Sequence, residues 1–144
     1  MKFGREVVTD CLTREQMLEE LSAFVAYFTE RGVETCDVLF GWHWGIKYYP
    51  GKEWPTENVA LSRLLAKVGE VEELGIGRLG DDDLYLKLPD LEFQFSHHSD
   101  VHIFFDSTSE DVEFFYSRWK QLGYNPAEWL KSLEGGPGTR VRMN

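Results

Sequence analysis

The strongest constraint on the fold lies between Leu84 and Asp106, where apolar and polar residues alternate in three short segments. Such alternation is the pattern of a β-strand with one buried face. Only Pro89-Asp90 and residues 97–100 join the segments, and connections this short require antiparallel neighbours. The run therefore predicts a three-strand antiparallel meander in the C-terminal half, with an apolar face that other elements must cover. The apolar positions are Leu84, Leu86, Leu88, Leu91, Phe93, Phe95, Val101, Ile103 and Phe105.

Helices can supply that cover. Apolar residues spaced by three or four predict helices over 14–31, over 57–74 and from Glu110 to about 122, with a short helix opening at Pro126. Thr13 and Gln16 are spaced as a capping box for the first helix, and Thr56 is the expected cap of the second. Residues 2–8 and 36–49 have the pattern of extended chain. The sequence thus predicts an α+β fold with a mostly antiparallel sheet of about five strands and three to four helices.

A chain of 144 residues has the length of one domain, and no internal repeat or linker divides it. We expect a single domain over residues 1–134. The stretch Gly135-Gly136-Pro137-Gly138 then predicts a flexible C-terminal tail over 135–144.

The charge balance limits the classes of partner. A formal net charge of −10 repels nucleic acids and anionic membranes and attracts basic proteins. Nucleic-acid binding would need a basic stripe, and the basic residues cluster only at Arg140 and Arg142. No apolar run approaches the ~20 residues that span a bilayer, and charges interrupt residues 1–21 where a signal peptide would be apolar. We expect a cytoplasmic protein with a basic protein partner, no nucleic acid and no membrane.

Chemical motifs are few. Cys11 and Cys36 do not form a CxxC pair, so we expect reduced thiols, although the sequence leaves a disulfide between them open. A thiolate pair of Cys36 with His43, or an acid–base pair of Glu92 with Asp106, would require the fold to bring these residues together. The sequence gives no reason to assign a catalytic residue or a cofactor.

Residues 75–80 spell GxGxxG, a motif that binds a pyrophosphate when it joins a strand to the start of a helix. Here it follows a predicted helix, precedes a strand, and is followed by Asp81, Asp82 and Asp83, which would repel phosphate. We therefore interpret it as a helix stop and a loop.

The four residues His97, His98, Asp100 and His102 lie close together in the sequence. Two histidines and a carboxylate can hold zinc or iron, which makes His98, Asp100 and His102 the candidate metal ligands. The predicted turn breaks the strand parity that would place His98 and His102 on one face. The alternative is a polar hairpin turn with one histidine in solvent, and we assign no metal.

Acidic clusters and aromatic residues predict a binding surface. Carboxylates at the end of the second predicted helix oppose its dipole, a local cost that suggests a functional acidic face. Tryptophan is enriched at interface hot spots, and the segment from Trp42 to Trp54 is rich in aromatic residues. The alternatives are a solvated surface and a packed sheet face. The predicted partner contacts are Trp42, Trp44, Glu72, Asp81, Asp82 and Asp83.

The stretch from Phe93 to His102, together with Phe115-Tyr116-Ser117-Arg118-Trp119-Lys120 and Gly123, resembles the small acidic immunity proteins of bacterial polymorphic-toxin and contact-dependent inhibition systems. The resemblance implies tight, stoichiometric inhibition of a cognate toxin, often a basic nuclease. Carboxylates would then mimic substrate phosphates. A second interpretation is a small enzyme or ligand-binding domain, with a pocket lined by aromatic residues and by His43, His98 or His102. A third is a structural or regulatory partner domain without a toxin.

Overall fold

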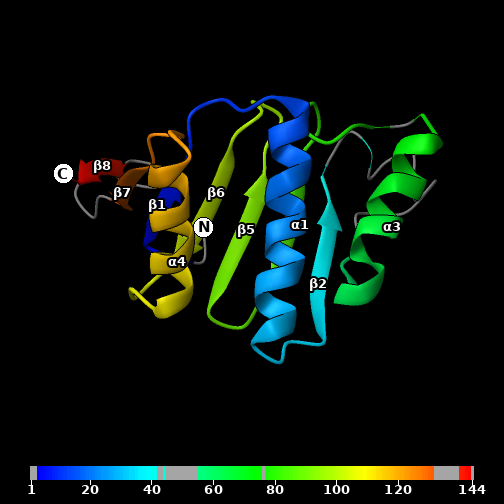
Figure 1. Ribbon diagram of the computed structural model, residues 1–144, viewed down its shortest axis with the longest axis horizontal. Helices are drawn as coiled ribbons and strands as arrows, with labels where there is room; N and C mark the ends of the chain where they lie inside the picture. Colours follow the sequence, from blue (N-terminus) through cyan, green and yellow to red (C-terminus); the bar gives the residue numbers. More distant parts are fainter. Residues whose placement is uncertain (1–2, 42–43, 45–54, 76, 132–139, 144) are drawn as a thin grey trace.

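The computed structural model describes residues 3–41, 44, 55–75, 77–131 and 140–143, which form a helical layer on a β-sheet (Figure 1). In this part of the chain, eight strands make one sheet in the order β3-β2-β4-β5-β6-β1-β7-β8, with every neighbouring pair antiparallel. Figure 1 shows α1 crossing the front of the sheet, with α4 on one side and α3 on the other. The elements are β1 (Arg5–Val8), α1 (Arg14–Glu30), β2 (Thr35–Phe40), β3 (Glu57–Ala60), α3 (Leu61–Glu73), β4 (Leu84–Lys87), β5 (Leu91–Phe95), β6 (Val101–Phe105), α4 (Glu110–Gln121), β7 (Ala127–Lys131) and β8 (Arg140–Met143).

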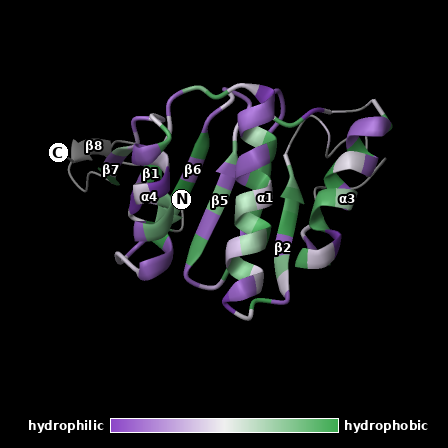
Figure 2. Cartoon of the chain, in the orientation of Figure 1, coloured by the Kyte–Doolittle hydropathy of each residue, from purple (hydrophilic) through white to green (hydrophobic). Residues whose placement is uncertain are grey.

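The predicted α+β class and antiparallel sheet are confirmed, and β4, β5 and β6 are the predicted meander. Hydrophobic and hydrophilic residues alternate along β5 in Figure 2, and its alternate side chains are buried. The capping box of α1 is also confirmed, because Thr13 and Gln16 bind each other's backbone amides. The described strands outnumber the five expected.

The core lies between the helices and the apolar face of the meander. Leu86, Phe93 and Ile103 are opposite one another across three strands, and each is at most 1 % exposed. The ring of Phe93 meets the edges of Phe24 from α1 and Phe115 from α4, each at a centroid distance of 4.9 Å. Such aromatic contacts add about 0.5–1.5 kcal/mol each to the burial of the rings. Phe93 therefore joins the sheet to two helices at once.

The helix predicted over 57–74 is partly wrong. Residues 57–60 form β3, in which Val59 is opposite Cys36, and α3 begins only at Leu61. Pairing with β2 satisfies backbone groups that a first helical turn would leave open. The helical apolar stripe starts at Leu61, where the helix itself starts.

The short helix predicted from Pro126 is wrong, because Ala127–Lys131 form β7. Trp129 lies opposite Glu6, so β7 occupies the second edge of β1. Pairing with β1 satisfies the backbone hydrogen-bonding groups of these residues along the whole strand, and this outweighs the apolar spacing that predicted a helix. Of the expected tail over 135–144, Arg140–Met143 form β8 and pair with β7.

The predicted extended segment 36–49 is confirmed in β2 as far as Phe40 and is wrong at Trp44, which is helical; residues 42–43 and 45–49 lie outside the described residues. Among the described helices, none has the length and apolar character needed to cross a bilayer.

Candidate functional site

The predicted acidic contacts gather where β2 ends and β4 begins, and there Asp83 binds several parts of its own chain. Its carbonyl oxygen accepts hydrogen bonds from Gly41 N at 2.8 Å and from Trp44 Nε1 at 2.6 Å. Its carboxylate accepts from Gln94 Nε2 at 3.1 Å and from His97 N at 2.9 Å. Asp83 therefore ties three loops together, which is a structural role.

Two other predicted contacts also turn inward. Trp44 is completely buried, so its indole is part of the core and not of the surface that the sequence suggested. Asp82 is 9 % exposed and accepts a hydrogen bond from Arg78 N at 2.9 Å. Asp81 is exposed. Trp42 lies outside the described residues.

The GxGxxG stretch follows α3 and precedes β4, as expected for a helix stop and a loop. Gly75 and Gly80 have φ angles of +73° and +95°, which glycine adopts without steric cost. A Cβ at Gly77 would lie 2.5 Å from the Cβ of Trp44. These glycines therefore serve the turn and the packing of Trp44.

Glu72, another predicted contact, holds α3 against the start of α1. Its two oxygens accept hydrogen bonds from Arg14 Nη1 at 2.7 Å and Nη2 at 2.8 Å, and Oε2 also accepts from Leu79 N at 2.9 Å. Burial opposes ionisation of Glu72, but the guanidinium and the amide outweigh it and lower the pKa of this carboxyl. Glu72 lies near the C-terminal end of α3, where the helix dipole disfavours a carboxylate, and its contacts with Arg14 and Leu79 explain why it is placed there.

The candidate metal ligands form a different cluster. His102 lies between two acids, with Nδ1 2.9 Å from Glu6 Oε2 and Nε2 2.7 Å from Asp100 Oδ1. The hydroxyl of Ser96 also donates to Asp100. Burial opposes ionisation of Asp100, but its hydrogen bonds with His102 and Ser96 lower its pKa. Both ring nitrogens of His102 are therefore engaged by carboxylates.

The neighbouring histidines complete the turn rather than a ligand set. His97 Nδ1 lies 3.0 Å from Asp83 Oδ1, and the His97 and His98 rings contact each other at a centroid distance of 4.0 Å. Within the described ranges, no group of three or more histidine, cysteine or acidic residues could hold a metal ion. Cys11 and Cys36 are both free, the first exposed and the second buried.

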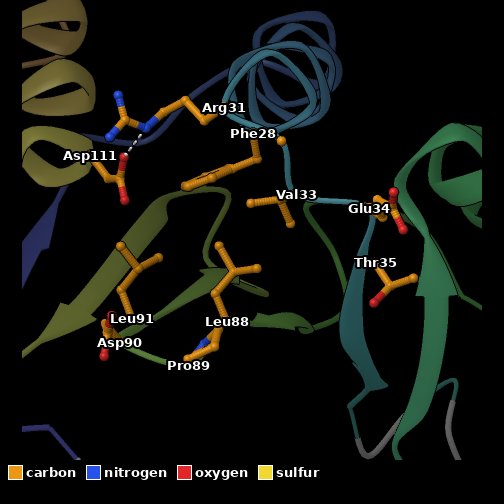
Figure 3. Close-up of a pocket in the computed structure, with 11 residues that line it drawn as sticks. Phe28, Arg31, Val33, Glu34, Thr35, Leu88, Pro89, Asp90, Leu91 and Asp111 are labelled. Atoms are coloured by element: carbon orange, nitrogen blue, oxygen red, sulfur yellow. Dashed lines mark ion pairs between the residues drawn. The ribbon is translucent and has the colours of Figure 1, made fainter.

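A groove of about 580 Å³ lies at the opposite end of the sheet, where α1 ends, β2 begins and β4 turns into β5. Figure 3 shows Phe28, Val33, Leu88 and Leu91 pointing toward one another in this groove. Phe28 and Leu91 are buried, whereas Val33 and Leu88 are half-buried. This volume is within the range of about 300–1,000 Å³ that small-molecule sites occupy. The groove therefore has an apolar floor of suitable size for a side chain or a small ligand.

Arg31 lies on one wall of the groove and is the only basic residue among the described residues that line it. Figure 3 shows its ion pair with Asp111. Arg31 Nε lies 3.0 Å from Asp111 Oδ1, and Nη2 lies 3.0 Å from Glu110 Oε2. The Tyr27 hydroxyl donates to Asp111 at 2.7 Å. Burial and this hydrogen bond raise the pKa of Tyr27 to about 12. These contacts fix Arg31 at the seam between α1 and α4.

The remaining charges of the groove are negative. Glu34 and Asp90 are both exposed, and neither forms an ion pair with any residue that the structure describes. The C-terminal end of α1 also reaches the groove, and a helix end of this kind carries partial negative charge. The groove therefore combines an apolar floor with a rim that favours positive charge.

Sequence reasoning did not single out this groove. Its residues come from three separate segments, around 28–35, 88–91 and 111, and their apolar members resemble ordinary core positions. A signal was nevertheless present, because Glu34 and Asp90 stand in connections between elements and no basic residue lies within two positions of either in the sequence. No protein-family model, curated protein or solved structure matches this chain.

Proposed function

We propose that this chain is a protein-binding inhibitor that neutralises a basic protein by stoichiometric binding, as immunity proteins neutralise toxins. The observation that carries the proposal is the groove, where an apolar floor formed by residues such as Val33 and Leu88 adjoins the carboxylates Glu34 and Asp90, which pair with no cation among the described residues. Apolar contact supplies affinity and complementary charge selects the partner. A net charge of −10 extends the same preference over the whole chain.

The acidic face at the other end contributes less to this proposal. Glu72, Asp82 and Asp83 are engaged in hydrogen bonds that hold the chain together. Asp81 remains a proposed contact because it is exposed. Contacts by Trp42 stay a prediction from the sequence.

Affinity capture tests the proposal. The tagged chain is incubated with lysate of its own cells at low salt, and retained proteins are identified by mass spectrometry. We expect a basic protein at a 1:1 ratio, weakened by salt because the attraction is partly screened. The purified partner must then lose its own activity when the chain is added in equal amount.

A pair of matched variants makes the capture specific. Glu34→Gln with Asp90→Asn removes two charges at the groove, and Glu15→Gln with Glu19→Gln removes two exposed charges near the start of α1. We expect the groove variant alone to lose most of the retained partner. Equal retention by both variants, or retention without inhibition, would contradict the proposed function.

A further inference from the structure

We propose that the groove receives one lysine or arginine side chain of the partner, with its aliphatic stem on the apolar floor and its cation at the rim, where Glu34 and Asp90 stand on opposite sides (Figure 3). This inference rests on the proposed function and names the chemical group that the groove recognises. The occupant is a side chain presented by a protein, because the groove is open and its charged groups stand at the rim.

The floor fits the stem of a long basic side chain. The half-buried side chains of Val33 and Leu88 offer apolar surface between the end of α1 and the turn from β4 to β5 (Figure 3). Lysine and arginine bury their methylene groups along apolar surface while their charged ends stay near water. A short or acidic side chain would use neither the floor nor the rim.

The rim fits the cation. Three carboxylates, Glu34, Asp90 and Asp111, line the groove against one guanidinium, that of Arg31. Arg31 is held by Asp111 and Glu110 at 3.0 Å each, so its charge is satisfied within the chain. The excess negative charge therefore lies with Glu34 and Asp90, which have no cationic partner in the described part of the chain.

Arg31, on the wall of the groove, is itself a basic side chain bound by carboxylates beside an aromatic ring. Its guanidinium lies 5.5 Å from the centroid of the Tyr27 ring while its nitrogens contact two carboxylates. An apolar or aromatic surface beside a carboxylate is thus already the environment of one basic side chain here. Glu34 and Asp90, which line the groove together with Val33 and Leu88, offer carboxylates beside apolar surface to a second one.

Nuclear magnetic resonance titration of the full chain tests this inference without the partner. The probes are N-acetyl-lysine methylamide, N-acetyl-norleucine methylamide, which has a similar stem without the charge, and spermidine. Ionic strength is held constant. We expect the lysine compound to shift the amide signals of Val33, Glu34, Thr35 and Asp90, and to bind more tightly than the norleucine compound.

The charge variants provide the matched comparison. Exposed ion pairs are individually weak. The double variant Glu34→Gln with Asp90→Asn should therefore lower the affinity of the chain for the lysine compound about three- to tenfold. Glu15→Gln with Glu19→Gln makes the same change in net charge and should leave its affinity unchanged. Urea unfolding of both variants confirms that each remains folded.

Three results would overturn the inference: equal affinity for lysine and norleucine compounds, equal weakening by both double variants, or spermidine binding the same residues far more tightly than the lysine compound. The last result would assign the groove to a free polyamine. The titrations contain no partner, so their failure is separate from failure of the capture and inhibition experiments.

Discussion

The indole of Trp119 donates a 2.6 Å hydrogen bond to Oε1 of Glu20, and this contact joins α4 to α1 inside the protein. Trp119 is completely buried and Glu20 is 2 % exposed. Arg118 binds the other oxygen of Glu20 from Nη2 at 2.7 Å and from Nε at 3.1 Å. A buried carboxylate is thus satisfied by one cation and one indole of the neighbouring helix, as buried charges require.

Removing this carboxylate should destabilise the chain strongly. Glu20→Ala leaves the indole N–H of Trp119 buried without its acceptor and separates Arg118 from its counterion, which we expect to cost about 3–5 kcal/mol. Arg63→Ala is the control, because Arg63 is 68 % exposed and lies 3.8 Å from Glu70, and such pairs contribute about 0–1 kcal/mol. Urea unfolding of both variants measures the difference, and equal losses would contradict the assigned role of Glu20.

Two glycines should respond to alanine in opposite directions. A Cβ at Gly77 would lie 2.5 Å from the Cβ of Trp44, so Gly77→Ala must displace a buried indole and should destabilise the fold by about 1–3 kcal/mol. Gly69 lies inside α3, and beyond its own helical backbone no atom of the described residues comes within 4 Å of an added Cβ. Gly69→Ala should therefore stabilise the fold by about 0.5–1 kcal/mol. Thermal unfolding of the pair is the measurement, and a shift of the same sign in both would refute the packing argument.

The sequence predicted the meander and α1 well because those segments are determined by local patterns. Alternation defines β5, and the box of Thr13 and Gln16 defines the start of α1. The sequence failed at β3 and β7, where pairing with distant strands decides the conformation. Val59 is a strand residue because Cys36 lies opposite it, and no local pattern records that partner.

The candidate site was predicted less well for the same reason. The sequence around Asp83 has the pattern of an exposed acidic surface. The partners of Asp83, Gln94 and His97, become its neighbours only in the folded chain. The burial of Trp44 and the groove beside Glu34 likewise depend on segments far apart in the sequence. Composition predicted the sign of the charge but not which charges remain free.

Acid should weaken the fold through Asp100 and Glu72. Their pKa values in the folded chain lie below the ordinary 3.8 and 4.5, so the unfolded chain binds more protons at low pH. The stability that they contribute is present above those ordinary values and is lost as the pH falls through the folded values. The two carboxylates should therefore contribute fully at neutral pH and progressively less below about pH 4.

Asp100→Asn tests this dependence. It should lower the unfolding free energy at neutral pH by about 1–3 kcal/mol, since it replaces the charged partner of His102, and the difference should shrink at about pH 3. Asp90→Asn, at an exposed residue, should change stability little at either pH. Urea unfolding at both pH values measures these differences, and a constant deficit for Asp100→Asn would refute the linkage.

The two thiols should differ in reactivity. Burial, with a smaller contribution from Asp37, raises the pKa of Cys36 to about 12, so its reactive thiolate is scarce at neutral pH. Cys11 is exposed. We expect a disulfide reagent to modify one thiol in the folded chain and two after unfolding, and Cys11→Ser to abolish the fast reaction. A fast reaction that survives Cys11→Ser would show that Cys36 is accessible.

The position of β1 in the sheet has a consequence for the order of assembly. Arg5 pairs with Phe105 on one side and with Leu130 on the other, so β1 is synthesised well before both of the strands that it pairs with. The strands of the meander are close in sequence and can pair early. Pairing of β1 with β6 closes a long stretch of chain, and the entropy that this costs slows folding. The substitution Val7→Ala in β1 should therefore accelerate unfolding more than it slows folding, which stopped-flow kinetics would show. β1 thus precedes β6 and β7 in the chain, but it can pair with them only after both have been made.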